Sequence, residues 1–163
     1  MNYKNLGTID GELVHVEIGC GSNKREMQGY ENIGIDVIDG PCVDKVCNLG
    51  FEDIPLPSDY ADFVQGIDFL EHVPKCLWVD GKRIVPLIDT MNEIWRIMKH
   101  GKELYLETPF SNWAYNRDPT HVSWLAEDWH NYFKKEDNLY YCILYTSADA
   151  EETNRTTPGS SHM

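Results

Sequence analysis

Apolar residues recur along the chain in short runs separated by turn-forming or helical segments. Six runs have the length and content of β-strands: 13–18, 33–37, 43–47, 61–66, 103–107 and 140–145. Between the fourth and fifth runs, apolar side chains recur every three or four positions from Ile84 to Met98, as in a helix with one buried face. Pro86 suits its first turn and Gly101 its end. This alternation predicts a doubly wound α/β fold, a mostly parallel sheet with helices on both faces, because parallel neighbours need crossover connections.

The order of these segments also predicts the domain organisation. Residues 1–146 have the size of a single domain, and the polar stretch 147–163 is predicted to be disordered. The segment 110–133, after the fifth run, is irregular and rich in aromatic residues. A long irregular insertion in a compact domain usually has a function, so we expect this segment to line a binding site.

Composition and charge narrow the classes of partner. The 163 residues are 42% hydrophobic and carry a formal net charge of -13. This charge disfavours nucleic acid, whose binding relies on Lys and Arg, and the apolar runs are too short for a membrane span. Five cysteines show neither a disulfide framework nor paired C-x-x-C spacing. We therefore expect a reducing, cytoplasmic location and no metal site; the oligomeric state stays open.

The stretch VEIGCGSN, residues 16–23, places a carboxylate and two glycines at the end of the first predicted strand. A turn this bare lets a ligand approach the backbone closely. Its glycines have the wrong offsets for a phosphate-binding loop, and Lys24 replaces the third glycine of a dinucleotide fingerprint. S-adenosylmethionine (SAM) fits better, because Glu17 can accept a hydrogen bond from its ammonium group.

The same loop resembles the E/D-x-G-x-G motif of class I SAM-dependent methyltransferases, which have a Rossmann-like fold. Residues 43–74, which end in LEHVP, and residues 91–110 are similar to two longer motifs of a small LEH-motif group within that family. The resemblance covers roughly residues 14–133. Because that family usually has seven strands and six are placed here, the sheet is expected to be shortened at its C-terminus.

The resemblance implies a set of cofactor-binding residues. Glu17 would contact the ammonium group, Asp36 the ribose hydroxyls, and Asn48 the adenine amino group, where the family usually has Asp. Loop, ring and methionine contacts complete the set: Gly19, Cys20, Gly21, Leu49, Gly66 and Ile67. Each residue also has a structural alternative: the glycines as a tight turn, the carboxylates as surface groups, and Cys20 as a small buried side chain.

A second group of candidates lies in the segment NRDPTHV, residues 116–122. It resembles a segment near the acceptor pocket of some of these methyltransferases. His121 could remove a proton from an acceptor hydroxyl or amine, or it could fix the loop by a hydrogen bond to Asp118. Aromatic side chains that could wall the acceptor site are Trp113, Tyr115, Trp124 and Trp129. Glu71 and His72 are expected to have a structural role at a helix start.

The resemblance implies transfer of a methyl group from SAM to an O or N acceptor, a small molecule or glycan, by in-line displacement. Positioning can supply much of the rate of such a reaction, so a dedicated base is optional. Two alternatives stay open. One is a non-catalytic SAM-binding module, and the other, less favoured, is an NAD-dependent oxidoreductase.

Overall fold

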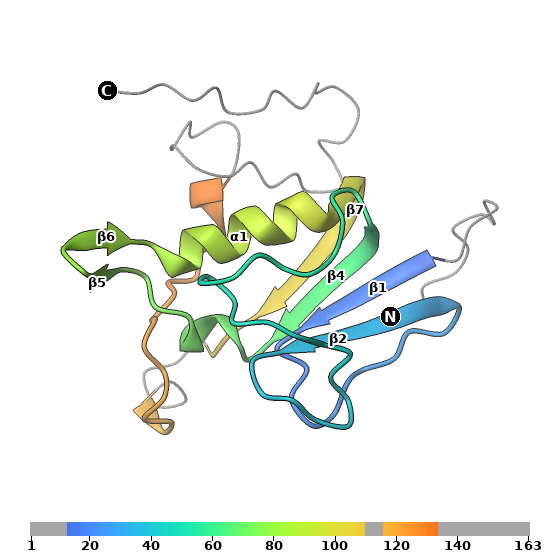
Figure 1. Ribbon diagram of the computed structural model, residues 1–163, viewed down its shortest axis with the longest axis horizontal. Helices are drawn as coiled ribbons and strands as arrows, with labels where there is room; N and C mark the ends of the chain where they lie inside the picture. The colour runs from blue at the N-terminus through green and yellow to red at the C-terminus, as the bar shows by residue number, and fades with distance from the viewer. Residues whose placement is uncertain (1–12, 110–115, 134–163) are drawn as a thin grey trace.

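The computed structural model describes residues 13–109 and 116–133, and its core is one parallel sheet of five strands in the order β3-β2-β1-β4-β7 (Figure 1). The strands are β1 (Leu13–Ile18), β2 (Tyr30–Asp36), β3 (Lys45–Val46), β4 (Ala61–Ile67) and β7 (Met98–Glu107). This sheet confirms the predicted α/β class. The predicted strand at 140–145 and the predicted tail at 147–163 lie outside the described residues.

Helix α1 (Pro86–Ile97) lies beside β4 and β7 and forms one side of the core (Figure 1). Its buried face contains Leu87, Met91, Ile94 and Ile97, which confirms the predicted apolar stripe. The predicted helix end was wrong. The chain passes directly from α1 into β7 at Met98, so the last strand starts five residues earlier than its apolar content indicated.

The connections between the first three strands are turns and irregular segments. Apart from α1, the described ranges hold one α-helical position, 116, next to residues that are not described, and neither 19–29 nor 37–44 forms a helix. Residues 37–44 are too few for a helix flanked by turns. A second layer of helices was expected, and none of it lies in the part of the chain that the structure describes. No described helix is long and apolar enough to cross a bilayer.

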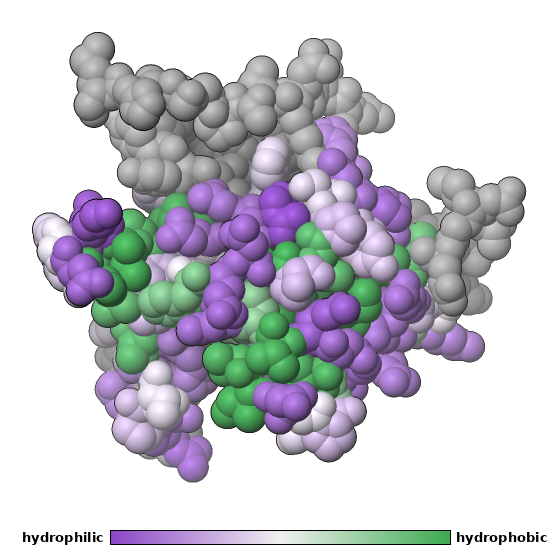
Figure 2. Space-filling model, in the orientation of Figure 1, coloured by the Kyte–Doolittle hydropathy of each residue, from purple (hydrophilic) through white to green (hydrophobic). Residues whose placement is uncertain are grey.

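A short antiparallel hairpin precedes α1 and was absent from the sequence-based prediction. It pairs β5 (Leu77–Val79) with β6 (Lys82–Ile84). Asp80 and Gly81, between the strands, both have positive φ, as a two-residue Asp-Gly hairpin turn requires. Trp78 is 72% exposed on this hairpin, and Figure 2 shows apolar surface around it.

An ion pair on α1 fixes the segment that precedes β4. The Arg96 guanidinium donates to the carbonyls of Ile54 and Leu56, each at 2.8 Å, and pairs with Glu93 at 2.7 Å. The Ile54 amide donates to the same Glu93 carboxylate. Although burial opposes ionisation, these contacts hold the pKa of Glu93 below its ordinary value. The segment is therefore anchored by charge as well as by apolar packing.

Phe69 packs between the carboxyl ends of β1 and β4, on the backbone of two glycines. A Cβ on Gly66 would lie 2.4 Å from Phe69 Cε1, and a Cβ on Gly19 would lie 2.4 Å from Phe69 Cβ. Gly19 also has a φ of +69°. Both positions therefore require glycine for packing, independently of any ligand.

This contact predicts the effect of adding one methyl group. Gly66→Ala should lower the free energy of unfolding by about 1 to 3 kcal/mol, the usual cost of overpacking a core. Gly40→Ala is the control, because its nearest heavy atom would be Val43 Cγ2 at 3.9 Å. Urea unfolding measures both variants, and Phe69→Leu should partly rescue Gly66→Ala. Equal stability of the two alanine variants would contradict the packing role.

Candidate cofactor site

The predicted cofactor residues gather where the strand order reverses. β1 pairs with β2 on one side and with β4 on the other, so the chain leaves β1 and β4 in opposite directions across the sheet. Gly19 follows β1, Asp36 ends β2, and Gly66 and Ile67 end β4. In open parallel sheets, ligands bind at this place, outside the carboxyl ends of the strands.

Glu17 is fully buried at the end of β1, and its carboxylate is already paired. Arg25 Nη1 lies 2.6 Å from Glu17 Oε1, and the Arg25 backbone amide donates to Oε2. This contact closes residues 19–25 into a loop around the carboxylate. Arg25 was not predicted from the sequence, because nothing in its position along the chain distinguishes it from an ordinary surface residue.

A hydrogen bond joins the glycine loop to the end of β2. The Gly21 amide donates to Asp36 Oδ2 at 2.9 Å, and the Ile38 amide donates to Asp36 Oδ1 at 3.1 Å. Gly21 has a φ of +55° and nothing within 4 Å of its Cβ position, so its backbone faces open space. The loop and the carboxylate expected to bind the ribose are therefore direct neighbours.

Lys24 has a different role from the glycine that it replaces in the dinucleotide pattern. No helix follows the loop, so no close contact between helix and sheet has to be accommodated. The Lys24 ammonium instead donates to Asp44 at 2.6 Å and to the carbonyl of Asn32 at 3.2 Å. The hydrogen bond that Lys24 donates to Asp44 raises the pKa of Lys24, despite an opposing effect of burial.

Asn48 lies in a tight turn after β3. Its carbonyl accepts from the amides of Phe51 and Glu52, each at 3.0 Å, and its own amide donates to the Glu52 carboxylate. The side chain is exposed, and Leu49 packs against the core. Asn48 is thus a turn residue, which was one of its two predicted roles, and its contact with adenine stays a prediction. Exposed apolar side chains lie at or after the ends of β2 and β3 in this region, where Figure 2 shows an apolar area: Val37, Ile38, Val46 and Phe51.

Cys20 is buried beneath the loop. Its thiol lies 3.5 Å from the carbonyl of Cys42 and under the backbone of Gly34. Burial, with the nearby carboxylates of Asp36 and Glu17, raises the pKa of Cys20 to about 11. The thiol is therefore a small buried packing group, which was the structural role considered for Cys20 from the sequence.

His121 lies next to Glu71 as well as to Asp118. Its Nε2 is 3.7 Å from Glu71 Oε1 and 4.0 Å from Asp118 Oδ2, and its side chain is only 8% exposed. Its ring also makes an edge contact with His72, with centroids 4.8 Å apart. Asp118 accepts from the hydroxyl and the amide of Thr120, which lowers its pKa. At 4.0 Å, Asp118 Oδ2 is beyond hydrogen-bonding range of His121 Nε2, and Glu71, which had been assigned a structural role, lies nearer to the ring.

Backbone contacts fasten the segment that contains His121 to the corner after β4, where η1 (Leu70–His72) follows Ile67. The amides of Val122 and Ser123 both donate to the Glu71 carbonyl, at 2.8 and 2.9 Å. The Ser123 hydroxyl donates to the carbonyl of Val73. A second short helix, η2 (Trp129–Phe133), packs against the core. Of the aromatic candidates, Trp124 is exposed and Trp129 is partly buried; Trp113 and Tyr115 lie outside the described residues.

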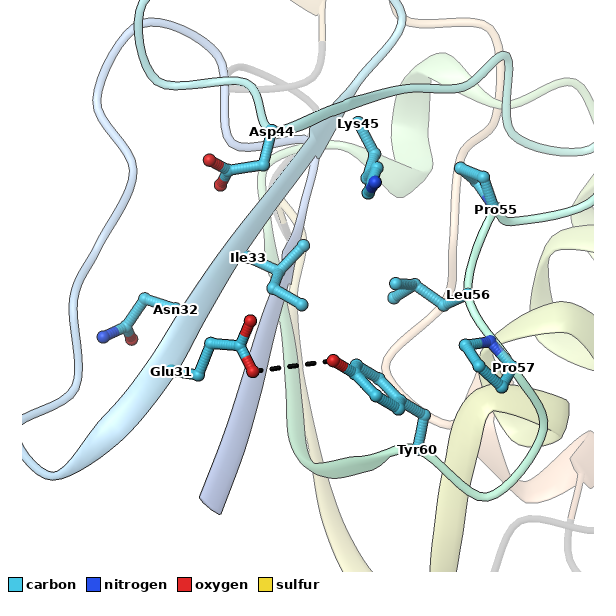
Figure 3. Close-up of a pocket in the computed structure, with 9 residues that line it drawn as sticks. All are labelled: Glu31, Asn32, Ile33, Asp44, Lys45, Pro55, Leu56, Pro57 and Tyr60. Atoms are coloured by element: carbon cyan, nitrogen blue, oxygen red, sulfur yellow. Dashed lines mark hydrogen bonds between the residues drawn. The ribbon is translucent and has the colours of Figure 1, made fainter. Parts of the chain in front are cut away.

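A cavity of about 440 Å³ lies away from these residues, beside β2 and β3 (Figure 3). The loop 55–57 and Tyr60 face it from the other side, and the Tyr60 hydroxyl lies 3.5 Å from a Glu31 oxygen. It contains none of the predicted cofactor residues. Because it lies beside the strands and not at their carboxyl ends, it is a poor candidate for the cofactor.

Comparisons with known proteins identify the fold. No family model and no curated protein matches the chain significantly. A SAM-dependent methyltransferase from Archaeoglobus fulgidus superposes with a TM-score of 0.56 at 20% identity, over 75% of this chain and 58% of that one. A complex of the Haloferax volcanii methyltransferase activator Trm112 with its proposed methyltransferase superposes with a TM-score of 0.50 at 14% identity, over 76% of this chain and 60% of that one.

These likenesses confirm a class I methyltransferase-like fold, and the chain spans about three fifths of each of these two structures. At this identity they establish the fold alone. The LEH-motif group remains a prediction from the sequence.

The buried thiols give a test of the site by chemical labelling. At pH 8, a pKa of about 11 leaves about one thousandth of Cys20 as the reactive thiolate, and the same holds for Cys47. Iodoacetamide should therefore modify the exposed Cys76 long before either residue in the native protein. Mass spectrometry of peptides measures the order. Native labelling of Cys20 as fast as that of Cys76 would show that its thiol is activated.

Proposed function

We propose that this protein binds SAM at the carboxyl ends of β1, β2 and β4 and transfers its methyl group to an O or N acceptor. The observation that carries the proposal is the 2.9 Å hydrogen bond between the Gly21 amide and Asp36, because it brings two predicted cofactor contacts together from separate strands. The fold of the two structural neighbours supports the same assignment.

Glu17 keeps the capacity to bind the ammonium group despite its pairing with Arg25. A carboxylate offers about four lone-pair sites, and Arg25 occupies two of them. Asp36 would accept hydrogen bonds from the ribose hydroxyls. Gly19 and Gly21 would let the cofactor approach the backbone closely, and Gly66 and Ile67 would lie beside its methionine part. Asn48 and Leu49 would contact the adenine ring.

The acceptor is proposed to be a small molecule or a glycan, approached from the side of η1 and residues 116–133. The lone pair of its O or N atom attacks the sulfonium methyl in line with the departing sulfur, so positioning is the main requirement. His121 is proposed to take the proton of a hydroxyl acceptor, with the carboxylates of Glu71 and Asp118 lying 3.7 and 4.0 Å from its Nε2.

A non-catalytic SAM-binding module is the second candidate. The carboxyl edge of the sheet would be enough to bind SAM, and the chain spans 58% and 60% of the lengths of the two structural neighbours. An NAD-dependent oxidoreductase is less favoured, because Lys24 replaces the third glycine and no helix follows the loop to receive a pyrophosphate.

Thermal unfolding with added nucleotides tests cofactor binding. SAM and S-adenosylhomocysteine should each raise the melting temperature in proportion to the logarithm of their concentration, and NAD should not. Asp36→Ala should weaken SAM affinity by about tenfold or more, because it removes a hydrogen bond to a charged group. Asp39→Ala is the matched control, since that exposed carboxylate lies three residues further on. Stabilisation by NAD alone would refute the proposal.

A pair of variants tests the proposed role of His121. With an alcohol acceptor that supports turnover, His121→Asn should lower kcat by about 10² to 10⁴ and leave SAM affinity unchanged. Asp118→Asn should have a smaller effect, since its carboxylate is half exposed and 4.0 Å from the ring. Production of S-adenosylhomocysteine measures both. Undiminished turnover in His121→Asn would assign His121 to holding the loop.

A further inference from the structure

Glu71, His72 and His121 form a cluster of metal-ligating side chains from two distant parts of the chain. One ligand atom from each lies within 4.8 Å of the other two. Glu71 and His72 belong to η1, whereas His121 belongs to the segment fastened onto it by the Val122 and Ser123 amides. The cluster is therefore placed by backbone hydrogen bonds and does not depend on chance approach of surface side chains.

The Glu71 carboxylate has no hydrogen-bond partner for either oxygen, although the residue is only 1% exposed. The cost of burying an ionised carboxylate in this state is several kcal/mol, and proteins normally offset it with a cation or with hydrogen bonds. His121 Nε2 lies 3.7 Å from Glu71 Oε1, which is beyond hydrogen-bonding range. Glu71 thus presents two unpaired, buried carboxylate oxygens next to the imidazole rings of His72 and His121.

The proton arrangement around His72 leaves a lone pair for a ligand. The single hydroxyl proton of Thr120 is donated to Asp118 Oδ1 at 2.5 Å, because a carboxylate only accepts. In the 3.0 Å contact between Thr120 Oγ1 and His72 Nδ1, the ring nitrogen must then be the donor and the hydroxyl oxygen the acceptor. A neutral His72 protonated on Nδ1 carries its lone pair on Nε2. Metal-binding histidines are commonly fixed in this way by a hydrogen bond from the other ring nitrogen.

We propose that Glu71, His72 and His121 bind a divalent transition-metal ion, with Zn²⁺ as the best match. Two imidazoles and one carboxylate suit Zn²⁺, whereas Mg²⁺ and Ca²⁺ prefer oxygen ligands. Tetrahedral Zn²⁺ with bonds of about 2.0 to 2.1 Å needs its ligand atoms about 3.3 Å apart. The His121 to Glu71 distance of 3.7 Å is already close to this value.

Three protein ligands leave one position of a tetrahedral ion open to a water molecule, and the ion lowers the pKa of that water. In the metal-bound protein His121 would be a ligand and not the base, and a water bound to the ion would supply the base that an alcohol acceptor needs. The metal site itself does not rest on the proposed methyl transfer. It is tested without SAM or acceptor, so failure of one proposal leaves the other standing.

The test measures Zn²⁺ binding to the full chain after removal of metals by chelation, in the presence of a non-thiol reductant. Isothermal titration calorimetry should give one Zn²⁺ per chain, and Zn²⁺ should raise the melting temperature where Mg²⁺ does not. Glu71→Gln, His72→Gln and His121→Gln should each weaken binding by tenfold or more. His130→Gln is the matched control, an exposed histidine on η2 outside the cluster. Equal affinity in all four variants, or no binding by the wild type, would overturn the proposal.

Two further measurements keep the test decisive if a variant unfolds. Glu71→Gln removes the buried charge without changing side-chain shape, so without metal it should be at least as stable as the wild type. Co²⁺ substituted into the wild type should show the visible absorption of a four- or five-coordinate N/O site. A thiolate charge-transfer band would instead place the ion on cysteines, and an octahedral spectrum would place it in solvent; either result overturns the proposal.

Discussion

The contact of Phe69 with the bare backbone of Gly19 and Gly66 is the constraint on which the carboxyl edge of the sheet depends. It fills the space between β1 and β4 where the strand order reverses, and it leaves no room for a Cβ on either glycine. Because Phe69 directly precedes η1, the same ring sets the position of Glu71 and His72. Packing of one aromatic side chain therefore links the glycine loop after β1 to η1.

An ion pair and hydrogen bonds add to this packing on both sides of Phe69. Arg25 closes the glycine loop over the buried carboxylate of Glu17, and the Gly21 amide ties that loop to Asp36. On the other side of Phe69, the amides of Val122 and Ser123 hold residues 116–133 on η1. The proposed cofactor and acceptor residues are thus held by separate sets of hydrogen bonds, and Phe69 packs between them.

Periodicity in the sequence predicted the elements that bury one face. The stripe from Leu87 to Ile97 identified α1, and the apolar runs located the five parallel strands, because both depend on local spacing. The start of β7 at Met98 was missed because Met98 is followed by four positions, 99–102, that are polar or glycine. The spacing of the motifs predicted that the cofactor candidates lie together at the carboxyl edge of the sheet. It could not identify Arg25, or join Glu71 to His121, because those contacts are formed by tertiary structure between segments that no local pattern connects.

The central claim is that a sulfonium nucleoside binds where β1, β2 and β4 end. A crystal structure with S-adenosylhomocysteine tests it most directly. The account predicts the ribose hydroxyls on Asp36, the amino acid part near Glu17 and the sulfur beside Gly66. Binding of the ligand in the 440 Å³ cavity beside β2 and β3, or an unliganded carboxyl edge at saturating concentration, would contradict it.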